Sequence, residues 1–134
     1  MKKLLLIVIL TISSFSLIEA QNLIGHNATD VRRLMKTLRP TFKEDVSIVN
    51  PKSIKYVDKT KDNTLMFFIN EKGICTYQKF MLDVSCAKNT VDTLSKRFKY
   101  LDNLTWADRR NSKDYVIKMV NNEWYFTIQI SEKD

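Results

Sequence analysis

The chain is poor in the residues on which most catalytic motifs depend. Its 134 residues include one His, two Cys, two Gly and two Pro. A single histidine, His26, excludes a multi-histidine zinc or non-haem iron site, and it leaves one imidazole as base for a serine or cysteine nucleophile. With Gly25 and Gly73 alone there is no glycine-rich phosphate loop, dinucleotide fingerprint or nucleophile elbow. We therefore expect no metal site and no cofactor.

The acidic side chains also form no recognisable site. The closest groupings, Glu44 with Asp45 and Asp58 with Asp62, lack the spacing of a calcium loop. His26 with Asp30 nearby is the one arrangement that leaves room for catalysis, and an enzyme acting there is our least favoured hypothesis. We predict a non-enzymatic protein without catalytic residues.

The first twenty residues have the three-part plan of a secretory signal peptide. Lys2 and Lys3 form a positive start, residues 4–10 are an unbroken apolar run, and Ala20 is a small residue before the cut. The clean apolar run is shorter than the about 20 residues that a transmembrane helix needs. We expect residues 1–20 to be removed, leaving residues 21–134 as a secreted or periplasmic protein with no membrane span.

The remaining composition is typical of a folded domain, with 44% hydrophobic and 28% charged residues. Lys and Arg outnumber Asp and Glu by 22 to 15, which gives a formal net charge of +7. Arg32, Lys36 and Arg39 recur at helical spacing and are candidates for contact with an anionic envelope component. The alternative is a solvated helix face whose cations complement the helix dipole. Nucleic acid is not expected as a partner of an exported protein.

Hydrophobic periodicity predicts two helices. The first runs from Gly25 to Pro40, with Asn27 as N-cap and apolar residues at positions 31, 34, 35 and 38. The second covers Ala87 to Tyr100, with Asn89 and Asp92 as the residues that could cap its start.

Alternating and apolar runs predict two β-hairpins, over residues 63–83 and 115–130, and shorter strands at 46–49, 54–57 and 104–108. Consecutive strands with short connections favour antiparallel pairing. The sequence thus predicts a single α+β domain over residues 21–134, with an antiparallel sheet of about five strands and two helices packed on one face.

The two cysteines leave their bonding state open. In an oxidising compartment a Cys75–Cys86 disulfide is favoured, and closing so short a loop would stabilise the fold by roughly 3 kcal/mol. A straight strand over residues 74–82 would, however, hold their Cα atoms farther apart than the about 7 Å that a disulfide permits. The bond therefore needs the strand to bend or stop near Phe80. Free buried thiols and an intermolecular bridge are the alternatives.

Apolar residues occur on both faces of the expected strands. Aromatic residues such as Phe67, Phe126 and Trp124 are expected mostly in the core. The other face is expected to carry a second apolar set, Met66, Phe68, Phe80, Val116 and Tyr125. Such a face needs cover from loops, or it exposes a patch that binds a partner. We take Phe68, Phe80 and Tyr125 as candidate contacts.

Residues 23–35 carry a resemblance to a known group of envelope proteins. Ile24, Gly25, Val31 and Leu34 match an I-G-x-x-x-x-x-V-x-x-L segment. This segment resembles the start of the SmpA/OmlA type of outer-membrane assembly lipoproteins and of the beta-lactamase inhibitory proteins, in which it opens a helix packed on an antiparallel sheet. The likeness covers about a tenth of the chain, which lacks a lipobox cysteine and has extra strands before its second helix. It implies a non-catalytic protein-binding module outside the cytoplasm and assigns no binding residues.

The sequence therefore predicts an exported protein- or envelope-binding module that is a monomer or weak dimer. A small-ligand or lipid carrier, with a pocket between sheet and helices, is the alternative.

Overall fold

The computed structural model describes residues 22–47, 50–58, 63–110 and 112–134. The expected signal peptide lies outside these residues, as does part of the strand expected at 46–49, whose described residues Val46 and Ser47 are not in a strand. No helix within the described ranges is long and apolar enough to cross a membrane.

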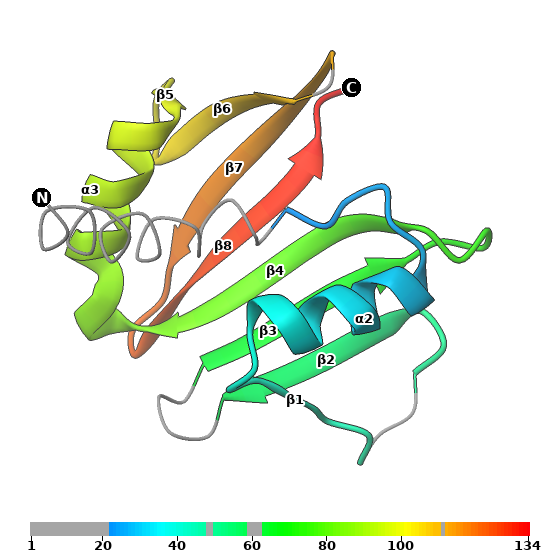
Figure 1. Cartoon of the computed structure of the whole chain (residues 1–134). Coiled ribbons are helices and arrows are strands. Elements are labelled where there is room, and N and C mark those ends of the chain that lie inside the picture. The colour runs from blue at the N-terminus through cyan, green and yellow to red at the C-terminus, as the bar shows by residue number, and fades with distance from the viewer. Residues whose placement is uncertain (1–21, 48–49, 59–62, 111) are drawn as a thin grey trace, which may run out of the picture.

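Eight strands form one antiparallel sheet (Figure 1). In chain order they are β1 (Lys43–Glu44), β2 (Ser53–Asp58), β3 (Asn63–Ile69), β4 (Cys75–Asp83), β5 (Lys99–Tyr100), β6 (Thr105–Arg110), β7 (Lys113–Asn121) and β8 (Tyr125–Glu132). Their order across the sheet is β1-β2-β3-β4-β8-β7-β6-β5. The chain therefore builds each half of the sheet by consecutive pairing and joins the halves where β4 pairs with β8.

Within the part of the chain that the structure describes, one helix precedes each half of the sheet. Helix α2 (Ala28–Leu38) comes before β1 to β4, and α3 (Ala87–Arg97) comes before β5 to β8. A short 3-10 turn, η1 (Val84–Cys86), links β4 to α3. The same order of one helix and four strands thus occurs twice, and α2 and α3 lie over different halves of the sheet (Figure 1).

This architecture corrects the expected fold class. The sheet has eight strands rather than about five, and the two helices have 11 residues each, so the fold is mostly sheet. Two of the additional strands, β1 and β5, have two residues each, which is too short for an alternating pattern to show. The expected end of the second helix at Tyr100 is wrong, because α3 ends at Arg97 and Lys99–Tyr100 form β5. The 54–57 and 104–108 segments are full members of the sheet, as parts of β2 and β6.

Helix α2 begins where its cap places it. The Asn27 side chain accepts a hydrogen bond from the Asp30 backbone N–H at 2.8 Å, as an N-cap does. The expected cap of the second helix is wrong. Helix α3 begins at Ala87, as expected, but it follows the η1 turn, where the Asp83 carboxylate accepts the Ser85 N–H at 2.9 Å. Asn89 therefore lies inside the helix.

The hydrophobic core lies between the helices and one face of the sheet. Val31 and Met35 of α2 and Leu94 of α3 are buried in it. Trp106 of β6 is fully buried, and its indole N–H donates to Ser95 Oγ of α3 at 3.1 Å. Every second residue of the long strands contributes to this core, notably Ile54, Leu65, Phe67, Ile117, Phe126, Ile128 and Ile130.

Candidate functional site

The other face of the sheet carries no helix or strand of the described residues, and we call it the open face. The strand register arranges its side chains in rows that run across the strands. The first row is Ser53, Phe68, Tyr77, Ser131, Val116 and Ala107; the second is Lys55, Met66, Lys79, Gln129, Lys118 and Thr105; the third is Val57, Thr64, Met81, Thr127 and Val120.

The open face is apolar in part but well packed. The Phe68 and Tyr77 rings meet edge to face with centroids 5.2 Å apart, and burial raises the pKa of the Tyr77 hydroxyl. Thr127 lies between Met81 and Val120 in its row and is 2% exposed. Neighbouring side chains on the sheet therefore half-bury the apolar residues of this face, so that these residues pack against one another.

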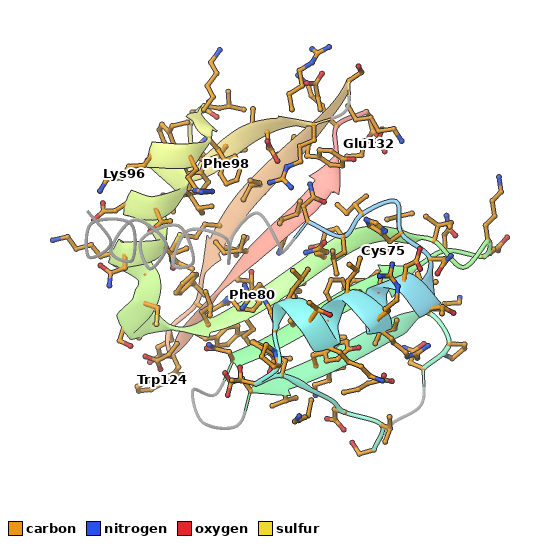
Figure 2. All side chains as sticks on the ribbon, viewed as in Figure 1. Cys75, Phe80, Lys96, Phe98, Trp124 and Glu132 are labelled. Atoms are coloured by element: carbon orange, nitrogen blue, oxygen red, sulfur yellow. The ribbon has the colours of Figure 1, made fainter. Side chains whose placement is uncertain are left out.

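Phe80 does not belong to this surface. It is 7% exposed and lies opposite Leu65 and Ile128, on the core face of the sheet. A β-bulge between Phe68 and Ile69 shifts the β3–β4 register. If the Ile69–Cys75 pairing continued without this bulge, Phe80 would share a face with Phe68, and the bulge moves it to the core. Figure 2 shows Phe80 on the α2 side of β4.

A cluster of exposed apolar residues lies at one end of the sheet. Trp124, at the tip of the β7–β8 hairpin, is 74% exposed, so its expected core position is wrong. Tyr125 beside it is 37% exposed, and Val84 is 45% exposed. The Val84 N–H donates to the Trp124 carbonyl at 3.3 Å, which holds η1 against the hairpin. We call these three residues the hairpin-tip cluster; Figure 2 shows Trp124 beyond the end of the strands.

The hairpin-tip cluster continues onto the open face. Tyr125 pairs with Asp83 at the end of β4, on the same face as Met81 and Thr127. Phe68 lies at the opposite end of that face, in the first row. The structure thus places the sequence candidates Phe68 and Tyr125 on the open face, whereas Phe80 lies on the core face of the sheet.

The basic residues of α2 do not form a continuous cationic stripe. The Arg32 guanidinium donates to both oxygens of Glu44, at 2.9 and 3.4 Å, and this hydrogen bonding raises the Arg32 pKa. Lys36 is exposed and, with Arg32, borders an open depression of about 520 Å³ between α2 and β2. The ion pair with Glu44 offsets the Arg32 charge that an anionic ligand would need.

Arg39 is buried rather than presented to solvent. It is 9% exposed, and its guanidinium carbon lies 5.4 and 5.2 Å from the ring centroids of Phe42 and Phe80. Burial lowers the Arg39 pKa, and the nearby Asp58 carboxylate opposes this effect. Arg39 therefore stabilises the core through cation–π contacts and is not accessible to a partner.

The Cys75–Cys86 disulfide, favoured by the cysteine count, is not formed. Cys75 opens the nine-residue strand β4, and Cys86 lies beyond its other end. Eight steps of about 3.3 Å separate the strand ends by roughly 26 Å, far more than a disulfide spans. Cys75 is fully buried and Cys86 is exposed. The strand does not bend near Phe80 to bring them together.

Local contacts engage the backbones of His26 and Asp30 and the Asp30 side chain. The Asp30 carboxylate forms an ion pair with Arg33 at 3.4 Å, and its backbone N–H is engaged by the Asn27 cap. The His26 carbonyl accepts the Cys75 N–H at 2.8 Å, which ties the chain before α2 to β4. Within the described ranges, no three His, Cys, Asp or Glu side chains gather as a metal site would require.

A small crevice lies between α3 and the sheet. It measures about 190 Å³ and is lined mainly by Phe80, Leu82, Leu94 and Ile128. Pockets that enclose a drug-sized ligand usually measure about 300 to 1,000 Å³. This crevice lies below that range, whereas the open depression of about 520 Å³ between α2 and β2 lies within it. The ligand-carrier hypothesis therefore stays a prediction.

Comparisons of the chain with protein-family models, with curated proteins and with solved structures found no match.

Proposed function

We propose that this protein is an exported binding module that recognises another protein through its open face and the hairpin-tip cluster. The observation that carries the proposal is Trp124, a 74% exposed tryptophan beside the exposed Tyr125 and Val84. Covering apolar side chains of this size with a partner removes them from water, which favours binding. Tryptophan and tyrosine are also the residues most enriched among the energetic centres of protein interfaces.

The rigidity of the surrounding elements supports this proposal. Tyr125 belongs to β8, which lies at the centre of the sheet between β4 and β7. Residues that are already fixed in the free protein lose less conformational entropy when they bind.

The area of the open face is close to that of a protein interface. The six long strands span about 29 Å by 20 Å, so the open face measures on the order of 600 Å². A standard interface buries roughly 800 Å² on each partner.

Affinity capture from an extract of the source cell tests the proposal. The protein is expressed from its full coding sequence, and Trp124→Ala and Phe68→Asp are compared with Leu101→Ala. Leu101 is 47% exposed and follows β5 at the far edge of the sheet, so it controls for the loss of an exposed apolar side chain. We expect the wild type and Leu101→Ala to retain one protein in stoichiometric amount. Trp124→Ala and Phe68→Asp should retain at least about 10-fold less.

Circular dichroism melts establish that each variant is folded. If Phe68→Asp does not fold, Trp124→Ala carries the test, because its side chain is largely outside the core. Equal retention by Trp124→Ala and Leu101→Ala, or no retained protein at all, would contradict the proposal.

A further inference from the structure

We propose that the partner of the open face is an acidic protein surface, whose carboxylates pair with Lys79 and Lys118 at the centre of that face. This inference rests on the proposed function and adds the chemistry of the partner. The structure brings the two lysines together from strands that are distant in sequence.

The β4, β8 and β7 registers define the arrangement. Lys79 lies directly opposite Gln129, and Gln129 lies directly opposite Lys118. The two lysines therefore flank one glutamine in a single row, with their Cα atoms about 10 Å apart, which is two strand spacings. Lys79 is half-buried and Lys118 is exposed.

The charge of this pair is not balanced within the described part of the chain. Neither Lys79 nor Lys118 forms an ion pair there, whereas Lys55 of the same row pairs with Asp45 at 3.6 Å. The carboxylates at the margin of the face are engaged elsewhere. Asp114 pairs with Arg109 at 3.7 Å, and Asp83 accepts from Ser85.

A second copy of this chain does not fit the open face. A symmetric dimer would bring the same patches together, so the lysine pairs of the two copies would meet at its centre. Opposed like charges cost free energy in a desolvated interface. Pairing along the sheet edges is also restricted, because β1 and β5 are two-residue strands that leave little backbone to extend.

The apolar rows on either side of the lysines favour a protein over an anionic polymer. The lysine row lies between the row of Phe68, Tyr77 and Val116 and the row of Val57, Met81 and Val120. A polysaccharide or lipid headgroup needs only the cations. A protein surface with apolar residues around one or two carboxylates would complement all three rows, and it would shield the charge pairs from water.

Carbodiimide cross-linking combined with Lys→Gln variants tests this inference. The reagent joins a lysine amine to a carboxylate at contact distance, so mapping the joined peptides identifies both residues. The test variant is the double Lys79→Gln/Lys118→Gln. Its charge-matched control is Lys88→Gln/Lys96→Gln on α3, whose side chains are exposed on the other side of the sheet.

We expect Lys79 or Lys118 to be joined to Asp or Glu of the captured protein. The double variant should bind that protein at least about 10-fold more weakly than the control, by titration calorimetry. Raising NaCl from low to high concentration should weaken binding of the wild type more than binding of the double variant, because salt screens the charge pairs.

Three outcomes would overturn the inference. If the double variant binds normally while Trp124→Ala does not, the proposed function stands and the acidic partner is wrong. If no protein is retained but the wild type binds polygalacturonate or phosphatidylglycerol vesicles through the two lysines, the ligand is an anionic polymer or lipid and both proposals fail. Cross-links from Lys79 to a second copy would instead indicate self-association.

Discussion

At the scale of single residues, specific contacts hold several of the polar groups that the fold buries. Gln78 is 1% exposed, and its side-chain oxygen accepts the Leu23 N–H, which ties the segment before α2 to β4. Arg39 is held over the rings of Phe42 and Phe80. Cys75 differs from these two residues, because its buried thiol is stable in the core only in the protonated, neutral form. Burial raises its pKa to about 11.

The Cys75 pKa predicts how stability depends on pH. A thiol with a raised folded-state pKa favours folding below its unfolded pKa of about 9, and this contribution is lost as pH rises toward 11. The free energy of unfolding of the wild type should fall by about 2 to 3 kcal/mol over this window relative to that of Cys75→Ala, which has no group to ionise.

Urea unfolding at several pH values measures this difference. Burial also raises the pKa values of Tyr56 and Tyr77, so both proteins should lose stability in alkali, and the difference between them isolates the thiol. A difference that is constant from pH 8 to pH 11 would show that Cys75 does not titrate as expected.

At the scale of elements, the two helices begin by different means. Helix α2 depends on the Asn27 cap, whereas the start of α3 is set by η1, where Asp83 binds Ser85 and lowers its own carboxyl pKa through those bonds. Both helices are short, and helices of 11 residues are marginal without tertiary packing. Their caps therefore decide where they start, and their buried residues decide whether they form.

The caps predict opposite results for two asparagines. Asn27→Ala should lower the free energy of unfolding by about 1 kcal/mol, because it leaves the Asp30 N–H without its acceptor. Asn89→Ala should change it by a few tenths of a kcal/mol at most and in the stabilising direction, because alanine is the better residue inside a helix. Chemical denaturation of both variants measures these values. Equal losses would show that Asn89 also acts as a cap.

At the scale of the whole molecule, the β4–β8 pairing joins two units in which the helix and the strands follow one another in the same order. Each unit has one helix and four strands, and each would expose a long apolar edge if it were separated at this pair. Exposed strand edges of this kind associate or aggregate. The core also runs across the junction, since Phe80 and Leu82 of β4 lie opposite Ile128 and Phe126 of β8.

The shared core predicts that the protein unfolds in one cooperative step. Its circular dichroism and tryptophan fluorescence transitions should coincide in urea. If the chain is divided between Asp83 and Ala87, neither fragment should melt cooperatively alone, and mixing the two should restore the native spectrum. An independent cooperative transition of either fragment would show that the two units are separate domains.

The sequence alone determined the local structure well. The Asn27 cap, the first helix and the two hairpins follow from short-range steric and hydrogen-bonding preferences. The alternating run over residues 115–130 predicted the second hairpin, and Tyr115, Ile117 and Met119 of its first strand are buried on one face of the sheet.

The tertiary structure alone decided which surfaces the molecule presents. Pairing between β4 and β8 joins segments separated by a helix and three strands, and no local pattern specifies it. The β-bulge places Phe80 on the core face. The two-residue strands β1 and β5 form the two edges of the sheet, and Trp124 is exposed at the hairpin tip. The Lys79–Lys118 row also exists only through that register. Sequence periodicity fixes which residues alternate along a strand, whereas long-range pairing fixes which strands, and therefore which faces, meet.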